Sequence, residues 1–274
     1  LAMATTVACT VFGTICGSSP ATAATMATVG LPEMKRFNYS DRLATGCVAA
    51  SGGLGMIMPP SVVLLVYGVL TGQSIGALFV AGILPAILIT VLFVATVSIL
   101  CIRTPEIGPA GERFGWGERL KALTGLMDTL LVFATVVGGL FFGWFTPTEA
   151  ASVGVIAVTV LSMAKRQLTW EGFKKSLDET LRTSCMVMFL IAGAVVFGKF
   201  LAVTRIPFNI ATWVGGLDLP PFAIMAVIVA IYFLGGCFMD SLAMIMLTIP
   251  VFYPVVMNLG YDPIWFGVIA VLVT

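Results

Sequence analysis

Long apolar stretches interrupted by glycine and proline constrain this chain more strongly than any other feature. Residues 77–102 contain no charged side chain, and a helix of that length would cross a hydrocarbon core of about 30 Å. Other stretches are similar, and the whole chain is 59% hydrophobic and only 10% charged. The sequence therefore predicts an all-α polytopic membrane protein.

Two small, polar stretches break these apolar runs. The first is Gly17-Ser18-Ser19-Pro20-Ala21, and the second is Ser51-Gly52-Gly53-Leu54-Gly55-Met56-Ile57-Met58-Pro59-Pro60-Ser61. Glycine and proline disfavour an uninterrupted helix, and backbone that leaves the helix at membrane depth needs partners in protein, water or a bound ion. Broken helices of this kind point to a transport site, so we expect the chain to be organised around these two breaks.

Composition excludes several other classes of protein. The formal net charge is +1 without a dense basic cluster, so nothing indicates nucleic-acid binding. The 6 cysteines are scattered and predict neither a disulfide framework nor a transition-metal site. The absence of histidine removes a histidine proton relay, a zinc metalloprotease and a Ser-His dyad. Because the chain starts at Leu1 and stops at Thr274 inside an apolar run, we expect a fragment of a longer protein.

The alternation of apolar runs and charged loops divides the chain into five segments. Residues 1–42 are predicted to form a re-entrant hairpin with its tip at residues 17–20, followed by a cytoplasmic loop. The second arm, residues 21–34, would give roughly 21 Å of helix, short of the membrane core. The other segments are a broken transmembrane helix with the following span (43–102), connecting and scaffold helices with cytoplasmic loops (103–204), an interfacial segment with a second re-entrant hairpin (205–262), and the start of a truncated second broken helix (263–274). Within the third segment, residues 165–182 are predicted as a loop, with room for a short surface helix, ahead of a span over 184–203.

Basic residues support this path. Of the 14 Lys and Arg residues, 12 lie in the three loops 33–42, 103–121 and 165–182, and only Lys199 and Arg205 lie elsewhere. In the proposed path these loops share one side of the membrane, which the positive-inside rule makes cytoplasmic.

The two predicted hairpins align with each other without gaps. An offset of 222 residues pairs Gly13 with Gly235, Ser18 with Asp240, Ser19 with Ser241, Ala21 with Ala243, Pro32 with Pro254 and Tyr39 with Tyr261. Five spans separate the copies, and an odd number inverts one copy relative to the other. The expected architecture is therefore an inverted-repeat ion-transporter-type fold with two re-entrant helical hairpins and broken transmembrane helices. The partner of the break at 51–61 would fall at 273–283.

Four motifs, in this order, resemble the large membrane subunit of tripartite ATP-independent periplasmic (TRAP) transporters, the DctM-like family. They are Gly17-Ser18-Ser19-x-Ala21, Gly55-x-Ile57-x-Pro59-Pro60-Ser61 followed by Tyr67-Gly68, Phe145-Thr146-Pro147-Thr148-Glu149-Ala150-Ala151, and Gly236-x-Phe238-Met239-Asp240 followed by Thr248-Ile249-Pro250. The resemblance covers the whole chain. It implies a multi-pass protein of a bacterial or archaeal cytoplasmic membrane that is not an enzyme.

The resemblance implies an elevator-type, sodium-coupled importer of an organic acid anion such as a C4-dicarboxylate or sialic acid. Na⁺ would be the coupling ion, and no cofactor is expected. The implied partners are a small membrane subunit (Q-type), a periplasmic substrate-binding protein (P-type), the lipid bilayer and the organic anion itself. The alternative is a single-component sodium–dicarboxylate or related anion symporter of similar architecture.

The resemblance also implies where ions and substrate bind. Sodium would lie at the hairpin tips against the broken helices, where hydroxyls, freed carbonyls and a carboxylate supply oxygen ligands. The expected Na⁺ ligands are Gly17, Ser18, Ser19, Ser51, Gly52 and Gly55 at the first site and Asp240 and Ser241 at the second. The expected substrate contacts are Ser18, Ser19, Pro59, Pro60, Ser61 and Thr248. Many relatives have further polar residues after the first tip, where this chain has Pro20 and Thr22.

Each of these residues also has a purely structural interpretation. The serines at the first tip could bond back to their own helix, and the glycines at 52, 53 and 55 could mark a close contact between helices. Asp240 could be the N-cap of the second arm of its hairpin. An intramembrane enzyme would need an aspartyl pair of Asp128 and Asp240, which we place near an interface and near a tip, and a membrane scaffold would leave the matched breaks unexplained.

Overall fold

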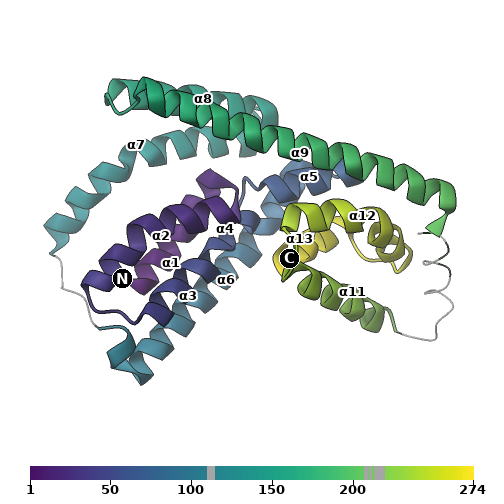
Figure 1. The fold of residues 1–274 in the computed structure, drawn as a ribbon, viewed down its shortest axis with the longest axis horizontal. Coiled ribbons are helices and arrows are strands. Elements are labelled where there is room, and N and C mark those ends of the chain that lie inside the picture. Colours follow the sequence, from purple (N-terminus) through teal and green to yellow (C-terminus); the bar gives the residue numbers. More distant parts are fainter. Residues whose placement is uncertain (110–114, 207–208, 210–211, 213–219) are drawn as a thin grey trace. The chain divides into compact units, whose positions relative to one another are not determined.

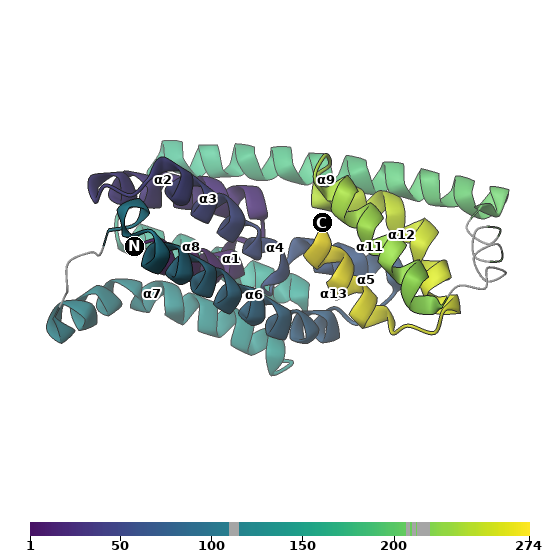
Figure 2. The same cartoon turned by 90° about the horizontal axis from the view of Figure 1, so that it is seen from below.

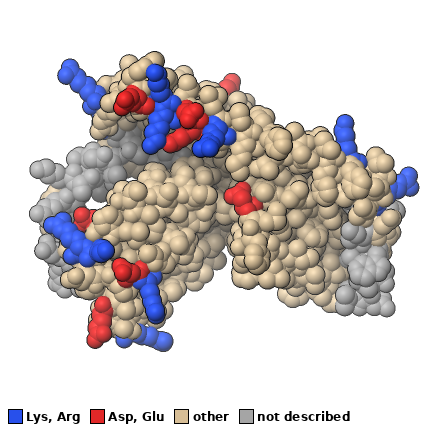
Figure 3. Space-filling model, viewed as in Figure 1, with Lys and Arg blue, Asp and Glu red and all other residues tan. Residues whose placement is uncertain are grey.

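The computed structural model describes residues 1–109, 115–206, 209, 212 and 220–274, with the backbone alone at some helical positions. Across these residues the chain is helical and has no β-strand, which confirms the predicted all-α class. Four described stretches are long and apolar enough to cross a membrane: Asp41–Thr71, Ile75–Arg103, Trp170–Leu201 and Ser241–Asn258. Much of the face drawn in Figure 3 carries no acidic or basic side chain, as expected for helices that face lipid.

The chain forms two compact units, Leu1–Gly111 with Ile191–Thr274, and Glu112–Leu190. All residues expected to bind an ion or substrate belong to the first unit. Its helices are α1 (Ala2–Cys16), α2 (Ser19–Arg36), α3 (Asp41–Gly52), α4 (Leu54–Ile57), α5 (Val62–Thr71), α6 (Ile75–Arg103), a 3-10 turn (Pro105–Ile107), α11 (Pro221–Gly236), α12 (Ser241–Asn258) and α13 (Pro263–Val273) (Figure 1). The second unit contains α7 (Trp116–Phe141), α8 (Pro147–Ala164) and the start of α9 (Trp170–Thr204).

Helices α1 and α2 form an antiparallel hairpin. Gly17 ends α1 in the left-handed conformation, with φ 61°, and its N–H donates to Gly13 O at 2.8 Å. Farther from this tip, Met34 and Ala2 share one buried apolar cluster, so the two arms run side by side. The turn lies within the predicted tip.

The second arm of this hairpin is longer than the sequence predicted. Helix α2 has 18 residues, or roughly 27 Å, because it continues through Pro32 and ends with Lys35 and Arg36, whose charges suit a helix C-terminus. The arm is thus longer than predicted, but it is still shorter than a hydrocarbon core of about 30 Å. The position of the hairpin in a membrane stays a prediction.

The third helix is broken where the sequence predicted. Helix α3 ends at Gly52, and α4 is a single turn that ends at Ile57. Residues 58–61 are not helical and include a cis peptide bond between Pro59 and Pro60. Ser61 then caps α5, since its Oγ accepts the Leu64 N–H at 3.2 Å.

The local structure of the first hairpin recurs at the predicted offset. Helix α12 begins and ends 222 residues after α2, and α13 begins 222 residues after α3. Ser40 and Asp262 cap α3 and α13 by accepting the backbone N–H three residues on, at 3.3 and 2.8 Å. Asn38 and Gly260, also 222 apart, have positive φ values of 57° and 81°. The inversion of the copies across a membrane stays a prediction.

Helices α11 and α12 form the second hairpin, and α13 follows it. Tyr232 on α11 faces α12, with its ring centroid 5.7 Å from that of Phe252. Helix α5 packs against both α12 and α13, and Figures 1 and 2 show it beside them. The second hairpin therefore contacts the far half of the first broken helix.

Helix α9 corrects the predicted loop at residues 165–182. One continuous helix runs from Trp170 to Thr204, where the sequence predicted a loop and then a separate span. The charged residues between 170 and 182 mark the end of the apolar stretch, and the sequence prediction treated them as a loop. Charged residues do not by themselves end a helix. Lys174 lies over the Trp170 ring at 5.5 Å, one turn along the same helix. The predicted interfacial segment at 205–221 falls largely outside the described residues.

Candidate ion and substrate site

The tip of the first hairpin packs directly against the broken helix. A Cβ atom on Gly13 would lie 2.7 Å from the Gly55 Cα, and one on Gly17 would lie 2.9 Å from the Pro60 carbonyl oxygen. Real Cβ atoms do not approach this closely, so the contact requires glycine at both positions. The structure thus brings together Gly17, Gly55 and Pro60, three of the predicted site residues.

Gly55 is also enclosed by the second arm of the hairpin. A Cβ there would lie 2.6 Å from Thr22 Oγ1 and 3.1 Å from the Ser18 carbonyl oxygen. Gly52 faces the same helix, with its Cβ position 2.6 Å from Ala23 Cβ. These glycines therefore make a close helix contact as well as marking the break, so both interpretations of them hold.

Four helix ends meet at this contact, and their polarity is suited to ions. Helices α1 and α4 end here, and α2 and α5 begin here: besides the Pro60 contact, the Gly17 Cβ position lies 3.9 Å from the backbone nitrogen of Val62, the first residue of α5. Helix N-termini favour anions, whereas the carbonyl oxygens of C-termini favour cations. One small region therefore offers favourable positions for both a cation and a carboxylate.

Ser18 keeps its hydroxyl free of helix capping. It is the N-cap residue of α2, yet its side chain accepts no capping hydrogen bond. Its carbonyl oxygen accepts the Thr22 N–H at 3.0 Å and the Thr22 hydroxyl at 2.8 Å. By contrast, the Ser61 hydroxyl accepts a hydrogen bond from α5. The Ser18 hydroxyl at the tip can therefore bind a ligand without giving up a capping hydrogen bond. Ser19 follows it as the first residue of α2.

Ser51, also predicted as a Na⁺ ligand, lies away from the tip. Its Oγ donates to Thr6 Oγ1 at 3.2 Å, and Thr6 Oγ1 lies 3.1 Å from Cys47 Sγ. Thr6 precedes Gly17 by about three helical turns on α1. The buried cluster of Ser51, Thr6 and Cys47 therefore joins α1 to the end of α3, about three helical turns of α1 away from the Gly17 turn.

Sequence reasoning missed a buried row of threonines on α1. Thr6, Thr10 and Thr14 are all buried, and Thr10 Oγ1 lies 3.1 Å from Thr90 Oγ1 on α6. Their spacing of four residues places them on one face of a helix. That spacing was visible in the sequence, and on this face of α1 Thr6 and Thr10 form hydrogen bonds to α3 and α6.

At the second hairpin, Asp240 is an N-cap. Its Oδ2 accepts the Leu242 N–H at 3.0 Å, and the residue is exposed, whereas Ser241 beside it is buried. Thr248, predicted as a substrate contact, lies between the arms of this hairpin. Its Oγ1 is hydrogen-bonded to the Tyr232 hydroxyl at 2.7 Å and donates to Met244 O. The capping interpretation of Asp240 thus holds, and its role in ion binding stays a prediction.

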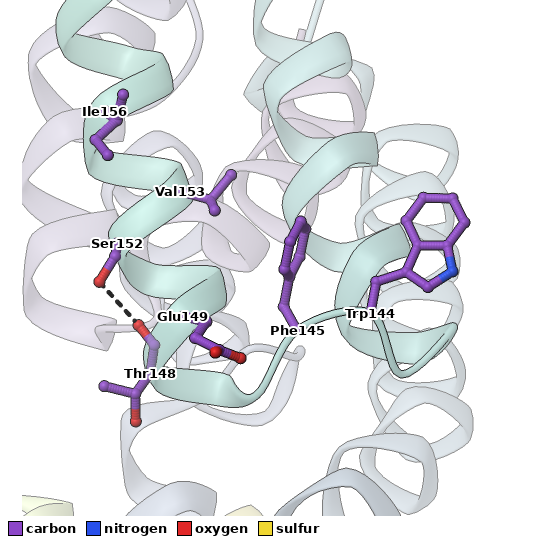
Figure 4. A pocket seen from close by; sticks show the side chains of 7 residues that line it. All are labelled: Trp144, Phe145, Thr148, Glu149, Ser152, Val153 and Ile156. Atoms are coloured by element: carbon purple, nitrogen blue, oxygen red, sulfur yellow. Dashed lines mark hydrogen bonds between the residues drawn. The ribbon is translucent and has the colours of Figure 1, made fainter.

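The turn before α8 contains the third motif and has a structural role. Thr146 Oγ1 accepts the Glu149 N–H at 3.3 Å, and Glu149 Oε2 accepts the Thr146 N–H at 2.8 Å, which is a capping box. A depression of about 450 Å³ lies beside it, lined by Trp144, Phe145, Thr148, Glu149, Ser152, Val153 and Ile156. Figure 4 shows Phe145 between the two helices and Trp144 pointing outward. None of the predicted site residues lines this depression, and the side chain of Asp128 is not among those described.

We expect Thr146→Ala to destabilise the start of α8 by about 1 kcal/mol, the usual effect of losing a threonine cap. Thermal unfolding of the purified protein in detergent measures this as a lower Tm. Thr148→Ala, two residues on, is the matched control, because its hydroxyl is not part of the capping box. Equal Tm values for wild type and Thr146→Ala would contradict the capping role.

The fold and the site define a polytopic helical membrane protein built around a broken helix. Comparison with known proteins gives its family: the family described as the tripartite ATP-independent periplasmic transporter, DctM component, matches residues 1–274. The chain belongs to this family, as its motifs predicted.

Individual relatives are similar over nearly the whole chain. The C4-dicarboxylate TRAP transporter large permease protein DctM of Pseudomonas aeruginosa is 35% identical over 99% of this chain and 64% of its own length. The sialic acid TRAP transporter large permease protein SiaM of Vibrio cholerae is 34% identical over 95% of this chain and 61% of its own. The ectoine/5-hydroxyectoine TRAP transporter large permease protein UehC of Ruegeria pomeroyi is 30% identical over 99% and 63%. The chain therefore spans slightly less than two thirds of the length of these relatives.

Proposed function

We propose that this chain forms the core of a TRAP transporter permease that imports an organic acid anion into a bacterial or archaeal cell, driven by Na⁺. The observation that carries the proposal is the contact between the first hairpin tip and the break, where Gly17 meets Pro60 and Gly13 meets Gly55. Four helix ends converge there in a family whose members are transporter components. The proposed location is the cytoplasmic membrane.

The chemistry of the tip supports a Na⁺ site. Na⁺ binds oxygen, and the tip offers the Ser18 hydroxyl together with carbonyl oxygens near the ends of α1 and α4. The N-termini of α2 and α5 favour a substrate carboxylate beside the cation. Asp240 and Ser241 would supply ligands for a second ion from the equivalent position of the repeat.

Coupling would follow from differential affinity. An ion that binds only when the substrate is bound links the two gradients. Each net charge that crosses the membrane contributes ~2.3 kcal/mol per 100 mV, so more Na⁺ than substrate charge would make uptake voltage-driven. We further propose an elevator-type movement, in which the hairpins and broken helices carry the site across the membrane.

The relatives' names suggest the range of substrates and partners. They include C4-dicarboxylate, sialic acid and ectoine, so the permease fold serves chemically different solutes. We propose that a periplasmic binding protein delivers the organic anion and selects it, and that a small membrane subunit accompanies the permease.

Uptake in proteoliposomes tests the proposal. The full-length protein is reconstituted with a Na⁺ gradient and labelled organic acids, and the small subunit and the binding protein from its genomic neighbourhood are supplied or withheld. We expect uptake that requires both Na⁺ and the binding protein. Na⁺-driven uptake without the binding protein would favour the single-component symporter, and absence of uptake by the folded protein would contradict both.

A further inference from the structure

Tyr67 joins the first broken helix to the second copy of the hairpin unit. It lies on α5, about two turns beyond the break, and its side chain is fully buried. The hydroxyl donates to the carbonyl oxygen of Pro263 at 2.6 Å, and Pro263 is the first residue of α13. A side chain from the first copy therefore binds the backbone of the second, 196 residues away.

Helix α13 is shaped around the Tyr67 ring. A Cβ on Gly267 would lie 2.7 Å from Tyr67 Cδ1 and 2.8 Å from Tyr67 Cζ, so only glycine leaves room for the ring. Phe266 meets the ring edge-on, with centroids 6.4 Å apart and an angle of 68°. The ring thus fits between α5 and α13 in one defined position.

A second hydrogen bond ties the other end of α5 to the second hairpin. Gln73 Nε2, just after α5, donates to the Tyr253 hydroxyl on α12 at 3.0 Å. The Tyr253 ring also meets Tyr67 edge-on, with centroids 6.4 Å apart. Helix α5 is therefore fixed to α12 and α13 at two points.

The opposite end of α5 belongs to the first candidate site. The helix begins at Val62, directly after the Ser61 cap, and the preceding residue Pro60 contacts Gly17 of the hairpin tip. The 10 residues of α5 form one helix without an internal break, which connects the hairpin tip to Tyr67 and Gln73. A displacement of the break would therefore move Tyr67, and with it the first turn of α13.

We propose that Tyr67 is a positioning residue that couples the first hairpin tip and its break to α13 and the second hairpin. Its use in transport rests on the proposed function, because an ion or substrate at the tip would supply the displacement. Helix α13 directly follows the second hairpin, whose Asp240 and Ser241 are the expected ligands of the second ion. Binding at the first site would in this way influence the backbone of the second.

Trp265 is a natural reporter for this coupling. It lies on α13 two residues after Pro263, is 44% exposed, and stacks on Tyr261 with ring centroids 5.3 Å apart. Trp265 is made the single indole by replacing with phenylalanine the other tryptophans of this chain, Trp116, Trp144, Trp170 and Trp213, and any in the remainder of the full-length protein. Tyr67→Phe then removes one hydroxyl and keeps the ring, and Tyr39→Phe is the matched control outside α5 and α13.

Two perturbations of the first site test the proposal in the full-length protein. In the first, Na⁺ is titrated while Trp265 emission and ²²Na⁺ binding are recorded together. We expect Na⁺ to change the emission of the reporter protein and of the Tyr39→Phe control. In Tyr67→Phe we expect ²²Na⁺ still to bind, with most of the emission change lost. The Na⁺ concentration for half-maximal uptake should rise about five-fold, as for the loss of one neutral hydrogen bond.

The second perturbation needs no ion. Gly55→Ala must displace Thr22 or the Ser18 carbonyl whether or not Na⁺ binds. We expect it to change Trp265 emission when residue 67 is tyrosine and not when it is phenylalanine, which is a double-mutant cycle across the proposed link. Equal responses in the two backgrounds would overturn the role of Tyr67. Absence of ²²Na⁺ binding would instead contradict the proposed function, while the Gly55→Ala cycle would still decide the coupling.

Discussion

Gly55→Val is expected to lower the initial rate of Na⁺-driven uptake strongly while leaving the protein in the membrane. The first added carbon alone would lie 2.6 Å from Thr22 Oγ1 and 3.1 Å from the Ser18 carbonyl. The two further methyl groups of valine must push the hairpin tip away from the break. Overpacking of this kind costs about 1–3 kcal/mol, which corresponds to a loss of uptake of roughly 5- to 150-fold, measured as the initial rate in proteoliposomes.

Gly46→Val is the matched control for this prediction. Gly46 lies on α3, the same broken helix, but a Cβ there meets no atom within 4 Å. We expect this variant to transport at the wild-type rate. If Gly55→Val transported as well as Gly46→Val, transport would not require close packing of the hairpin tip against the break, and the proposed site would be wrong.

Asp240→Asn is expected to raise the Na⁺ concentration for half-maximal uptake about ten-fold. Asparagine caps a helix as well as aspartate does, so the bond to the Leu242 N–H can persist. The change removes the negative charge, and an interaction with a charged group is typically worth about 1.5–3 kcal/mol. The variant therefore separates the proposed ion binding by Asp240 from its capping of α12, and capping is the role that the structure shows.

Asp262→Asn provides the comparison for Asp240→Asn. Asp262 is also exposed and caps α13 through the Trp265 N–H at 2.8 Å, but it follows a loop between helices and not a hairpin tip. We expect the Na⁺ concentration for half-maximal uptake by Asp262→Asn to match that of the wild type. A Na⁺ dependence of Asp240→Asn that is unchanged from wild type would restrict Asp240 to its structural role.

Helix breaks and caps were predictable because they depend on local chemistry. Proline and glycine at residues 52–60 disfavour a helix wherever they occur, and the structure breaks the helix there. The repeat was visible in the sequence through pairs such as Gly13 with Gly235 and Pro32 with Pro254, and the structure adds that Ser40 and Asp262 cap equivalent helices. The continuous helix α9 was missed because charge content, which marks an exit from the membrane, was treated as a helix end.

Contacts between distant elements were less predictable. The sequence placed Ser51 at the first site together with Ser18, yet its hydroxyl bonds to Thr6, because the face of α3 that meets α1 depends on packing across the whole hairpin. The bond from Tyr67 to Pro263 spans 196 residues, and no spacing rule in one sequence reveals such a pair. Roles in ion binding depend on such tertiary contacts and on ligands, so they stay predictions.

Binding of ²²Na⁺ to the purified full-length protein is the most direct test of a cation site at the first hairpin tip. We expect saturable binding to the wild type and about ten-fold weaker binding to Ser18→Ala, which loses a hydroxyl that caps no helix. Ser40→Ala, which removes a serine that does cap a helix, should bind Na⁺ as the wild type does. Equal affinities of Ser18→Ala and wild type, or no saturable binding by the wild type, would contradict a Na⁺ site at the first hairpin tip.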